Sequence, residues 1–109
     1  MSRLPLSVLA MTLSAVAVPA PAQAPIAVTL TDTGFEPAEI TVAAGEPFTL
    51  IVHNASAAAA EIEAKDLRVE KVVAAGADIT INLRAQDPGT YLFVNEYKED
   101  RVFGHITVK

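Results

Sequence analysis

Three carboxylates lie close together in the middle of the chain: Glu61, Glu63 and Asp66. Glu61 and Glu63 are two residues apart, so on a β-strand their side chains would project from the same face. Asp66 would follow at the bend after that strand. Converging carboxylates suit hard cations such as Fe(III), Mn(II) or Ca(II), and Cu(II) if a histidine joins them. The spacing indicates a candidate cation site; the alternative is that these acids only keep an acidic domain in solution.

Other site chemistries lack the side chains they need. The sequence contains no cysteine, which excludes thiol redox chemistry, cysteine-based zinc or iron–sulfur ligation and a cysteine nucleophile. No serine lies in a Gly-x-Ser-x-Gly elbow, the turn that exposes the nucleophile of many hydrolases. We therefore expect no enzymatic activity.

The two histidines do not form an obvious imidazole site. His53 ends a segment in which Val52 is expected to point inward, so His53 should point outward. His105 is opposite in phase to Ile106 and should face outward or toward the loop end. A redox carrier with a nonstandard copper site built on either histidine is therefore the least favoured function.

The first residues have the layout of a signal peptide. Arg3 is the only charge in the first thirty residues and precedes an apolar stretch, residues 4–18. Small residues follow, and we favour cleavage after Ala22 over Ala24, because the second cut would leave Pro25 beside it. This predicts a signal peptide over residues 1–22 and a periplasmic domain over residues 23–109. A retained anchor is the alternative, but the apolar stretch is short for a span of about 20 residues.

The predicted mature chain is short and acidic. Of 8 basic residues, Arg3 belongs to the leader, so 7 remain against 13 acidic residues, a net charge of −6. Fewer than 90 residues suffice for one domain with a modest core. Nucleic acid is a poor partner for such a surface, because its binding needs clustered Lys and Arg. A cation or a basic protein face fits the charge better.

Short alternating segments separated by turn residues run through the mature chain and predict β-strands. They cover residues 26–30, 39–42, 48–52, 78–83, 91–94 and 105–108. Residues 61–73 fit a short strand, a bend and another strand, while the alanine-rich segment 55–60 could begin a helical turn. Turns about every ten residues favour a single all-β sandwich.

Two motifs resemble the cupredoxin-like family over nearly all of the mature chain. The first is Phe35-x-Pro37-x-x-Ile40-x-Val42-x-Ala44-Gly45-x-x-Phe48-x-Leu50-x-Val52-x-Asn54; the second is Gly89-x-Tyr91-x-Phe93 with Gly104-x-Ile106-x-Val108. The resemblance implies a Greek-key β-sandwich. We expect Phe35, Ile40 and Val42 to fill the inner face of one sheet, and residues 48–52 to line the next with their alternate side chains.

The copper ligands of that family do not carry over. The positions of its first histidine and its cysteine are held here by Glu61 and Asn95. Its second histidine falls near Lys98, and its methionine near Val102 and Phe103. A type 1 copper site needs a thiolate, usually with two imidazoles, so the resemblance implies the fold without blue-copper electron transfer.

A narrower resemblance joins the acidic residues. The segments Glu61-Ile62-Glu63-x-x-Asp66-Leu67-x-x-Glu70-Lys71 and Asn95-Glu96-Tyr97-x-x-Asp100 are similar to a cupredoxin-like subgroup of periplasmic proteins tied to high-affinity bacterial iron uptake. The family topology would bring the closing loop beside the first segment. We therefore predict that Glu61, Glu63, Asp66 and Glu96 bind a metal ion, copper or iron, in an accessory protein beside an iron permease. We interpret Glu70, with Lys71, as a surface feature of the following strand. The alternative function is a metal-free module that docks onto a permease or another partner.

Overall fold

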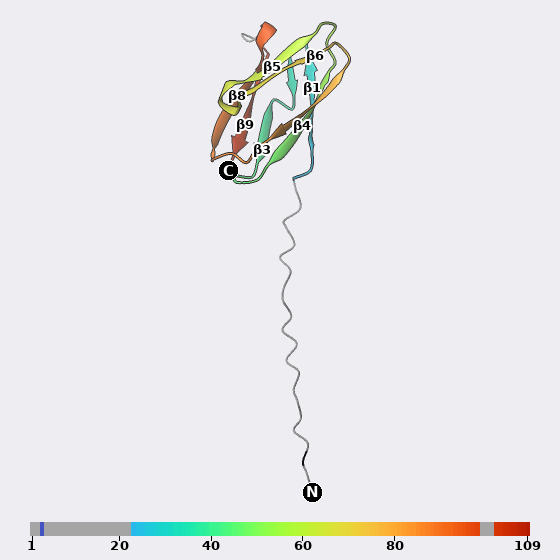
Figure 1. The fold of residues 1–109 in the computed structure, drawn as a ribbon. Helices are drawn as coiled ribbons and strands as arrows, with labels where there is room; N and C mark the ends of the chain where they lie inside the picture. Colours follow the sequence, from blue (N-terminus) through green and yellow to red (C-terminus); the bar gives the residue numbers. More distant parts are fainter. Residues whose placement is uncertain (1–2, 4–22, 99–101) are drawn as a thin grey trace.

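The computed structural model describes residue 3, residues 23–98 and residues 102–109, which form two β-sheets packed face to face (Figure 1). The four-stranded sheet has the order β2 (Gly34–Glu36), β1 (Ile26–Thr31), β4 (Phe48–Asn54), β7 (Asp78–Leu83). The five-stranded sheet has the order β3 (Glu39–Val42), β9 (Phe103–Val108), β8 (Gly89–Asn95), β5 (Ala60–Ala64), β6 (Val69–Val73). The predicted signal peptide lies outside the described residues, apart from Arg3.

Two short 3₁₀ turns complete the described elements: η1 (Lys65–Leu67) joins β5 to β6, and η2 (Glu96–Lys98) follows β8. Neither they nor any other described segment forms a helix that is long and apolar enough to cross a membrane. The chain changes sheets repeatedly: β1 pairs in parallel with β4, and β3 in parallel with β9. These crossed connections confirm the expected Greek-key sandwich.

The predicted strands are confirmed, with small changes at their ends. Residues 39–42 and 78–83 form strands with the predicted bounds, and residues 60–73 form a strand, a 3₁₀ turn and a strand. The alanine-rich segment begins no helix, because residues 56–58 form a bend and Ala60 already belongs to β5. The three-residue strand β2 was not predicted, because it is too short to show an alternating pattern.

The core lies between the sheets and is built from alternate strand residues, each of which points inward. Leu30, Val52 and Ile106 are at most 2% exposed. The aromatic rings of Phe35 and Phe93 meet edge to face across the core, with ring centres 4.7 Å apart. Phe35 is buried as predicted, but it belongs to β2 in the four-stranded sheet, whereas Ile40 and Val42 line the five-stranded sheet. The expectation that all three share one sheet is therefore wrong.

Gly104 allows β9 to pass close to its neighbours. A Cβ atom at this position would lie 2.4 Å from Cζ of Phe93 and 2.5 Å from the carbonyl oxygen of Ala38. That same oxygen accepts a hydrogen bond from the backbone N–H of His105 at 2.8 Å. The absence of a side chain at Gly104 thus lets Phe93 reach the core while β9 keeps its contact with the segment before β3.

Candidate metal centre

The site begins with the alternation of β5. Ala60, Ile62 and Ala64 are at most 4% exposed and face the core, so Glu61 and Glu63 must face the outer side of the five-stranded sheet. Because β5 lies between β6 and β8, its outward side chains are crowded by both neighbours. The Glu63 side chain is only 10% exposed, which is unusual for a carboxylate on a sheet surface.

Neighbouring elements bring two more carboxylates to the same place. Across the antiparallel β5–β6 pair, Glu63 lies directly opposite Glu70. The turn η2, which packs against β5, carries Glu96 (Figure 1). Glu61, Glu63, Glu70 and Glu96 each offer one oxygen, and these four oxygens all lie within 4.8 Å of one another. We call these four residues the carboxylate cluster.

Asn95 fixes the backbone around the carboxylate cluster. Its side chain is 4% exposed, and its Oδ1 accepts hydrogen bonds from the backbone N–H groups of Glu61 and Tyr97, both at 3.2 Å. The Asn95 N–H donates to the carbonyl of Val102, and the Val102 N–H donates to the carbonyl of Lys98, both at 2.9 Å. The residue in the family's cysteine position thus ties η2 to β5, which holds Glu96 near Glu61.

The crowding of like charges raises the pKa of two cluster members. The pKa of Glu96 rises to about 7, chiefly because its protonated carboxyl can hydrogen bond to Glu63 and then to Glu61, with partial desolvation and repulsion adding to the effect. The pKa of Glu70 is also raised, first by a hydrogen bond with Glu61 and then by repulsion from the Glu61 carboxylate. The cluster therefore favours a bound proton or another cation.

Two basic side chains lie beside the cluster: Lys65 and Arg68 help line a hollow with Glu63, Glu70 and Glu96. Lys65 Nζ is 3.5 Å from Oε1 of Glu63, but the Lys65 side chain is 85% exposed. An ion pair so open to water contributes little to stability, because the solvent screens it and holding a long side chain in place costs entropy. Most of the charge of the carboxylate cluster is left without a basic partner among the described residues.

The structure brings together three of the four sequence-predicted ligands. Asp66 lies exposed in η1, outside the carboxylate cluster, and Glu70 joins Glu61, Glu63 and Glu96 instead. Sequence reasoning treated Glu70 as a surface residue. The signal that could have identified it is the hairpin register: centring the β5–β6 turn on residues 66–67 places Glu70 opposite Glu63. Two further acids of the closing loop, residues 99 and 100, lie outside the described residues.

Both histidines lie away from the cluster. His53 points outward from β4 in the other sheet and hydrogen bonds to Asp78. His105 also points outward, as predicted, and its Nδ1 is 3.0 Å from Oε1 of Glu39. No imidazole among the described residues therefore joins the four carboxylates, and the nonstandard copper site remains without support.

The positions of the family's copper ligands offer no type 1 donor set. The side-chain oxygen of Asn95 already accepts a hydrogen bond from the backbone N–H of Glu61. Lys98 Nζ donates to Oδ1 of Asp32 at 3.1 Å. Val102 is fully buried in the core. The sequence has no cysteine, so the thiolate that defines a blue-copper centre cannot be supplied. The residues do not fit type 1 copper.

Comparison with solved structures finds the same fold in several proteins. The metal-binding domain of the Cu(I)-exporting P-type ATPase CopA from Streptococcus pneumoniae D39, solved with Cu(I), is 22% identical, with a TM-score of 0.67 over 78% of this chain and 84% of that one. Auracyanin from Roseiflexus castenholzii is 21% identical, with a TM-score of 0.64 over 82% of this chain and 99% of that one. Such identities show a shared fold.

A third similar structure is the purple cupredoxin from Nitrosopumilus maritimus, 12% identical with a TM-score of 0.58, covering 77% of this chain and 99% of that one. Comparison with curated proteins finds no significant match. The profile of the cupredoxin-like domain, in contrast, matches residues 4–108. Together with the two-sheet architecture, this match shows that the chain belongs to the cupredoxin-like domain family.

Proposed function

We propose that this protein is a periplasmic metal-binding accessory of iron, or copper-assisted iron, uptake, and that it binds a hard cation through the carboxylate cluster. The observation that carries the proposal is the convergence of four carboxylate oxygens within 4.8 Å of one another. The iron-uptake role rests on the resemblance of the acidic segments to the subgroup described above. An iron permease is the partner that this role would require.

The chemistry of the donors selects among metals. Oxygen-only sites suit Fe(III), Mn(II) and Ca(II), whereas Cu(I) prefers thiolate or thioether sulfur and Cu(II) gains from imidazole. The cluster offers only oxygen donors. Three of its carboxylates come from the paired strands β5 and β6, so part of the donor geometry is set by the sheet before any ion arrives. The ligands we propose are Glu61, Glu63, Glu70 and Glu96, and Asp66 leaves the ligand set.

A thermal-shift titration of the purified protein tests the proposal. After chelator treatment, Fe(III) held by a weak chelator, Mn(II), Ca(II), Zn(II) and Cu(II) would each be added at graded concentrations. A ligand that binds only the native state raises the unfolding temperature. At a hundredfold excess of ligand over Kd, the free energy of unfolding rises by about 2.7 kcal/mol. We expect a saturable rise with one hard cation, and none with Cu(I) supplied under reducing conditions.

A matched pair of double variants assigns the site. Glu61→Gln with Glu63→Gln should abolish the metal-dependent rise, measured relative to the metal-free form of the same variant. Glu36→Gln with Asp87→Asn removes the same charge at two exposed positions outside the cluster, and it should leave the rise intact. If both pairs respond alike, the cation binds to general surface charge and the site assignment fails.

The metal-free docking module remains the second candidate, and one observation favours it. Leu92 and Phe103 are 48% and 47% exposed on the same outer sheet face as the cluster. Leu92, Val94 and Glu63 also help line a shallow hollow of about 200 Å³. A flat response to every metal, combined with capture of a purified candidate permease that a Leu92→Ser variant abolishes, would replace the metal proposal with this one.

A further inference from the structure

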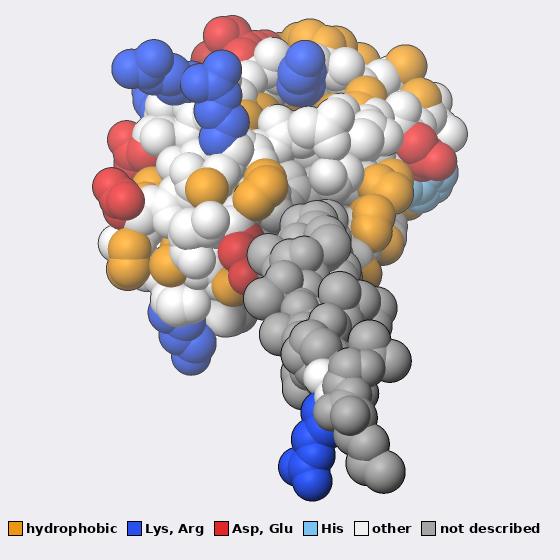
Figure 2. All heavy atoms as spheres, turned by 60° about the horizontal axis from the view of Figure 1, so that its bottom comes forward, with side chains coloured by type: hydrophobic (Ala, Val, Ile, Leu, Met, Phe, Trp, Pro, Cys, Tyr) orange, Lys and Arg blue, Asp and Glu red, His pale blue; other side chains and the backbone are white. Residues whose placement is uncertain are grey.

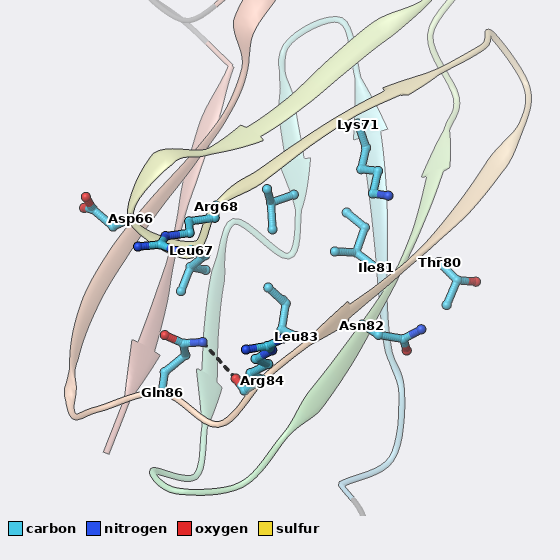
Figure 3. Close-up of a pocket in the computed structure, with 11 residues that line it drawn as sticks. Asp66, Leu67, Arg68, Lys71, Thr80, Ile81, Asn82, Leu83, Arg84 and Gln86 are labelled. Atoms are coloured by element: carbon cyan, nitrogen blue, oxygen red, sulfur yellow. Dashed lines mark hydrogen bonds between the residues drawn. The ribbon is translucent and has the colours of Figure 1, made fainter.

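A second polar feature lies on the open side of the sandwich, next to the carboxylate cluster, and Arg68 lines both. It is a groove of about 680 Å³ between β6 and β7, the last strands of the two sheets (Figure 3). Residues 66–69 and 71 line one side, and residues 80–84 and 86 line the other. None of the four cluster residues is among them.

Both walls of the groove are sheet edges. In the described part of the chain, β6 pairs only with β5 and β7 pairs only with β4. Side chains from both faces of β7 line the groove, the exposed Thr80 and Asn82 together with the buried Ile81 and Leu83. This is possible only if the edge of β7 itself forms the wall. An unpaired strand edge is a template for one more strand.

The groove is basic although the chain is acidic. Arg68, Lys71 and Arg84 line it together with one acid, Asp66, whose side chain lies on the same side as the Arg68 guanidinium (Figure 3). None of the three basic side chains forms a salt bridge with another described residue. In Figure 2, basic side chains gather along the upper left margin of the face shown. Three of the 7 basic residues that follow Arg3 thus line one feature.

We propose that this groove binds an acidic, extended segment of a partner protein, which adds as a strand along β7. Residues 80–84 offer about 16 Å of edge, at roughly 3.3 Å per residue, so the segment would be five or six residues long. Alternate side chains of such a strand point to opposite faces. One set would lie on the inward side, over the apolar Leu67, Ile81 and Leu83 and near Lys71. The other set would carry carboxylates outward, toward the exposed Arg84.

The charge of the groove selects the partner. Lys71 shares the inward face of β6 with Val73, because only alternate residues point inward. An inward lysine at a sheet edge discourages pairing with apolar or basic strands. The same charge favours an acidic strand, and charge complementarity of this kind contributes specificity and association rate more than affinity. Binding should therefore be weak and should fall as salt is added.

The test uses a capped, fluorescein-labelled hexapeptide of alternating Glu and Val, titrated against the purified protein at low salt with anisotropy as the readout. Lys71→Gln with Arg84→Gln should weaken binding about tenfold, because two positive charges beside the peptide are lost. The control pair, Lys65→Gln with Lys109→Gln, removes the same charge outside the groove and should leave the affinity unchanged. A Lys/Val hexapeptide should not bind.

Hydrogen exchange shows where the peptide binds. Amides of β7 should gain protection when the Glu/Val peptide is added, while amides of β3 at the far edge of the other sheet should not. No binding at low salt, or an equal loss in both double variants, would overturn the proposal. Binding without protection at β7, or displacement by citrate at concentrations as low as those of unlabelled peptide, would identify a site for small anions and would also overturn it.

Discussion

At the residue scale, two amino acids decide the properties of the carboxylate cluster: Asn95, which holds its backbone, and Glu96, which carries its most perturbed acid. Asn95 is buried and bonds two backbone N–H groups through one oxygen. Glu96 is exposed, yet its pKa rises to about 7, chiefly because its protonated carboxyl can hydrogen bond to Glu63 and Glu61. Asn95 sets the geometry of the cluster, and the raised pKa of Glu96 reports the interaction among its carboxyl groups.

Replacing Asn95 by Ala should destabilise the protein. The N–H groups of Glu61 and Tyr97 would lose their acceptor near a buried position, and an unsatisfied buried donor costs about 1–3 kcal/mol. Chemical denaturation would measure the loss. An exposed amide that lines the groove, Asn82, provides the control, and Asn82→Ala should change the free energy of unfolding by less than about 0.5 kcal/mol. Equal effects of the two substitutions would contradict the role of Asn95.

Stability of the metal-free protein should depend on pH through Glu96. Its pKa is about 7 in the folded protein against an ordinary value of 4.5, so the folded state binds more protons between these values. Stability must then fall as pH rises from about 4.5 to about 7, because the proton that relieves the repulsion is lost. Thermal unfolding from pH 4.5 to 8 would record the fall. In Glu96→Gln the slope over this window should be smaller, and an unchanged slope would place its cause elsewhere.

At the element scale, strands and core follow from local patterns, whereas the site depends on pairing between strands. Alternation alone locates Ile40, Val52 and Ile106 in the core, because an inward side chain recurs every second residue. Glu70 is different: its place opposite Glu63 depends on where the β5–β6 turn falls, and a shift of one residue would turn it to the other face. The members of the carboxylate cluster are therefore harder to predict than the fold.

Gly104 offers a test of how closely the elements pack. Gly104→Ala would place a methyl group 2.4 Å from Phe93 and 2.5 Å from backbone. The carbonyl of Ala38 cannot move without disturbing its bond to His105. We expect a loss of about 1–3 kcal/mol, the usual effect of overpacking. Gly34→Ala is the control, since nothing lies within 4 Å of a Cβ there. Equal denaturation midpoints for the two variants would mean that β9 can move away from Phe93 and Ala38 without loss of stability.

At the scale of the whole molecule, opposite charges gather in two adjacent places on one small sandwich, and Arg68 lines both. The carboxylates gather on the outer face of the five-stranded sheet, and basic side chains line the groove between β6 and β7. The net charge of −5 for the full chain indicates a cation or a basic protein as partner. It does not indicate the basic groove. Net charge is a sum over the molecule, so it cannot reveal how charges are distributed by the topology.

The hydrogen bonds of Asn95 also bear on how the protein is made. Where a metal ion is needed to hold loops together, the domain folds only when the ion binds. The amount of folded protein then depends on the metal supply. Here the side-chain amide of Asn95 holds η2 against β5 through two hydrogen bonds. These bonds need no atom from outside the chain. Under the proposed function, the domain would therefore fold even in a metal-starved cell, which is when a component of metal uptake is needed most.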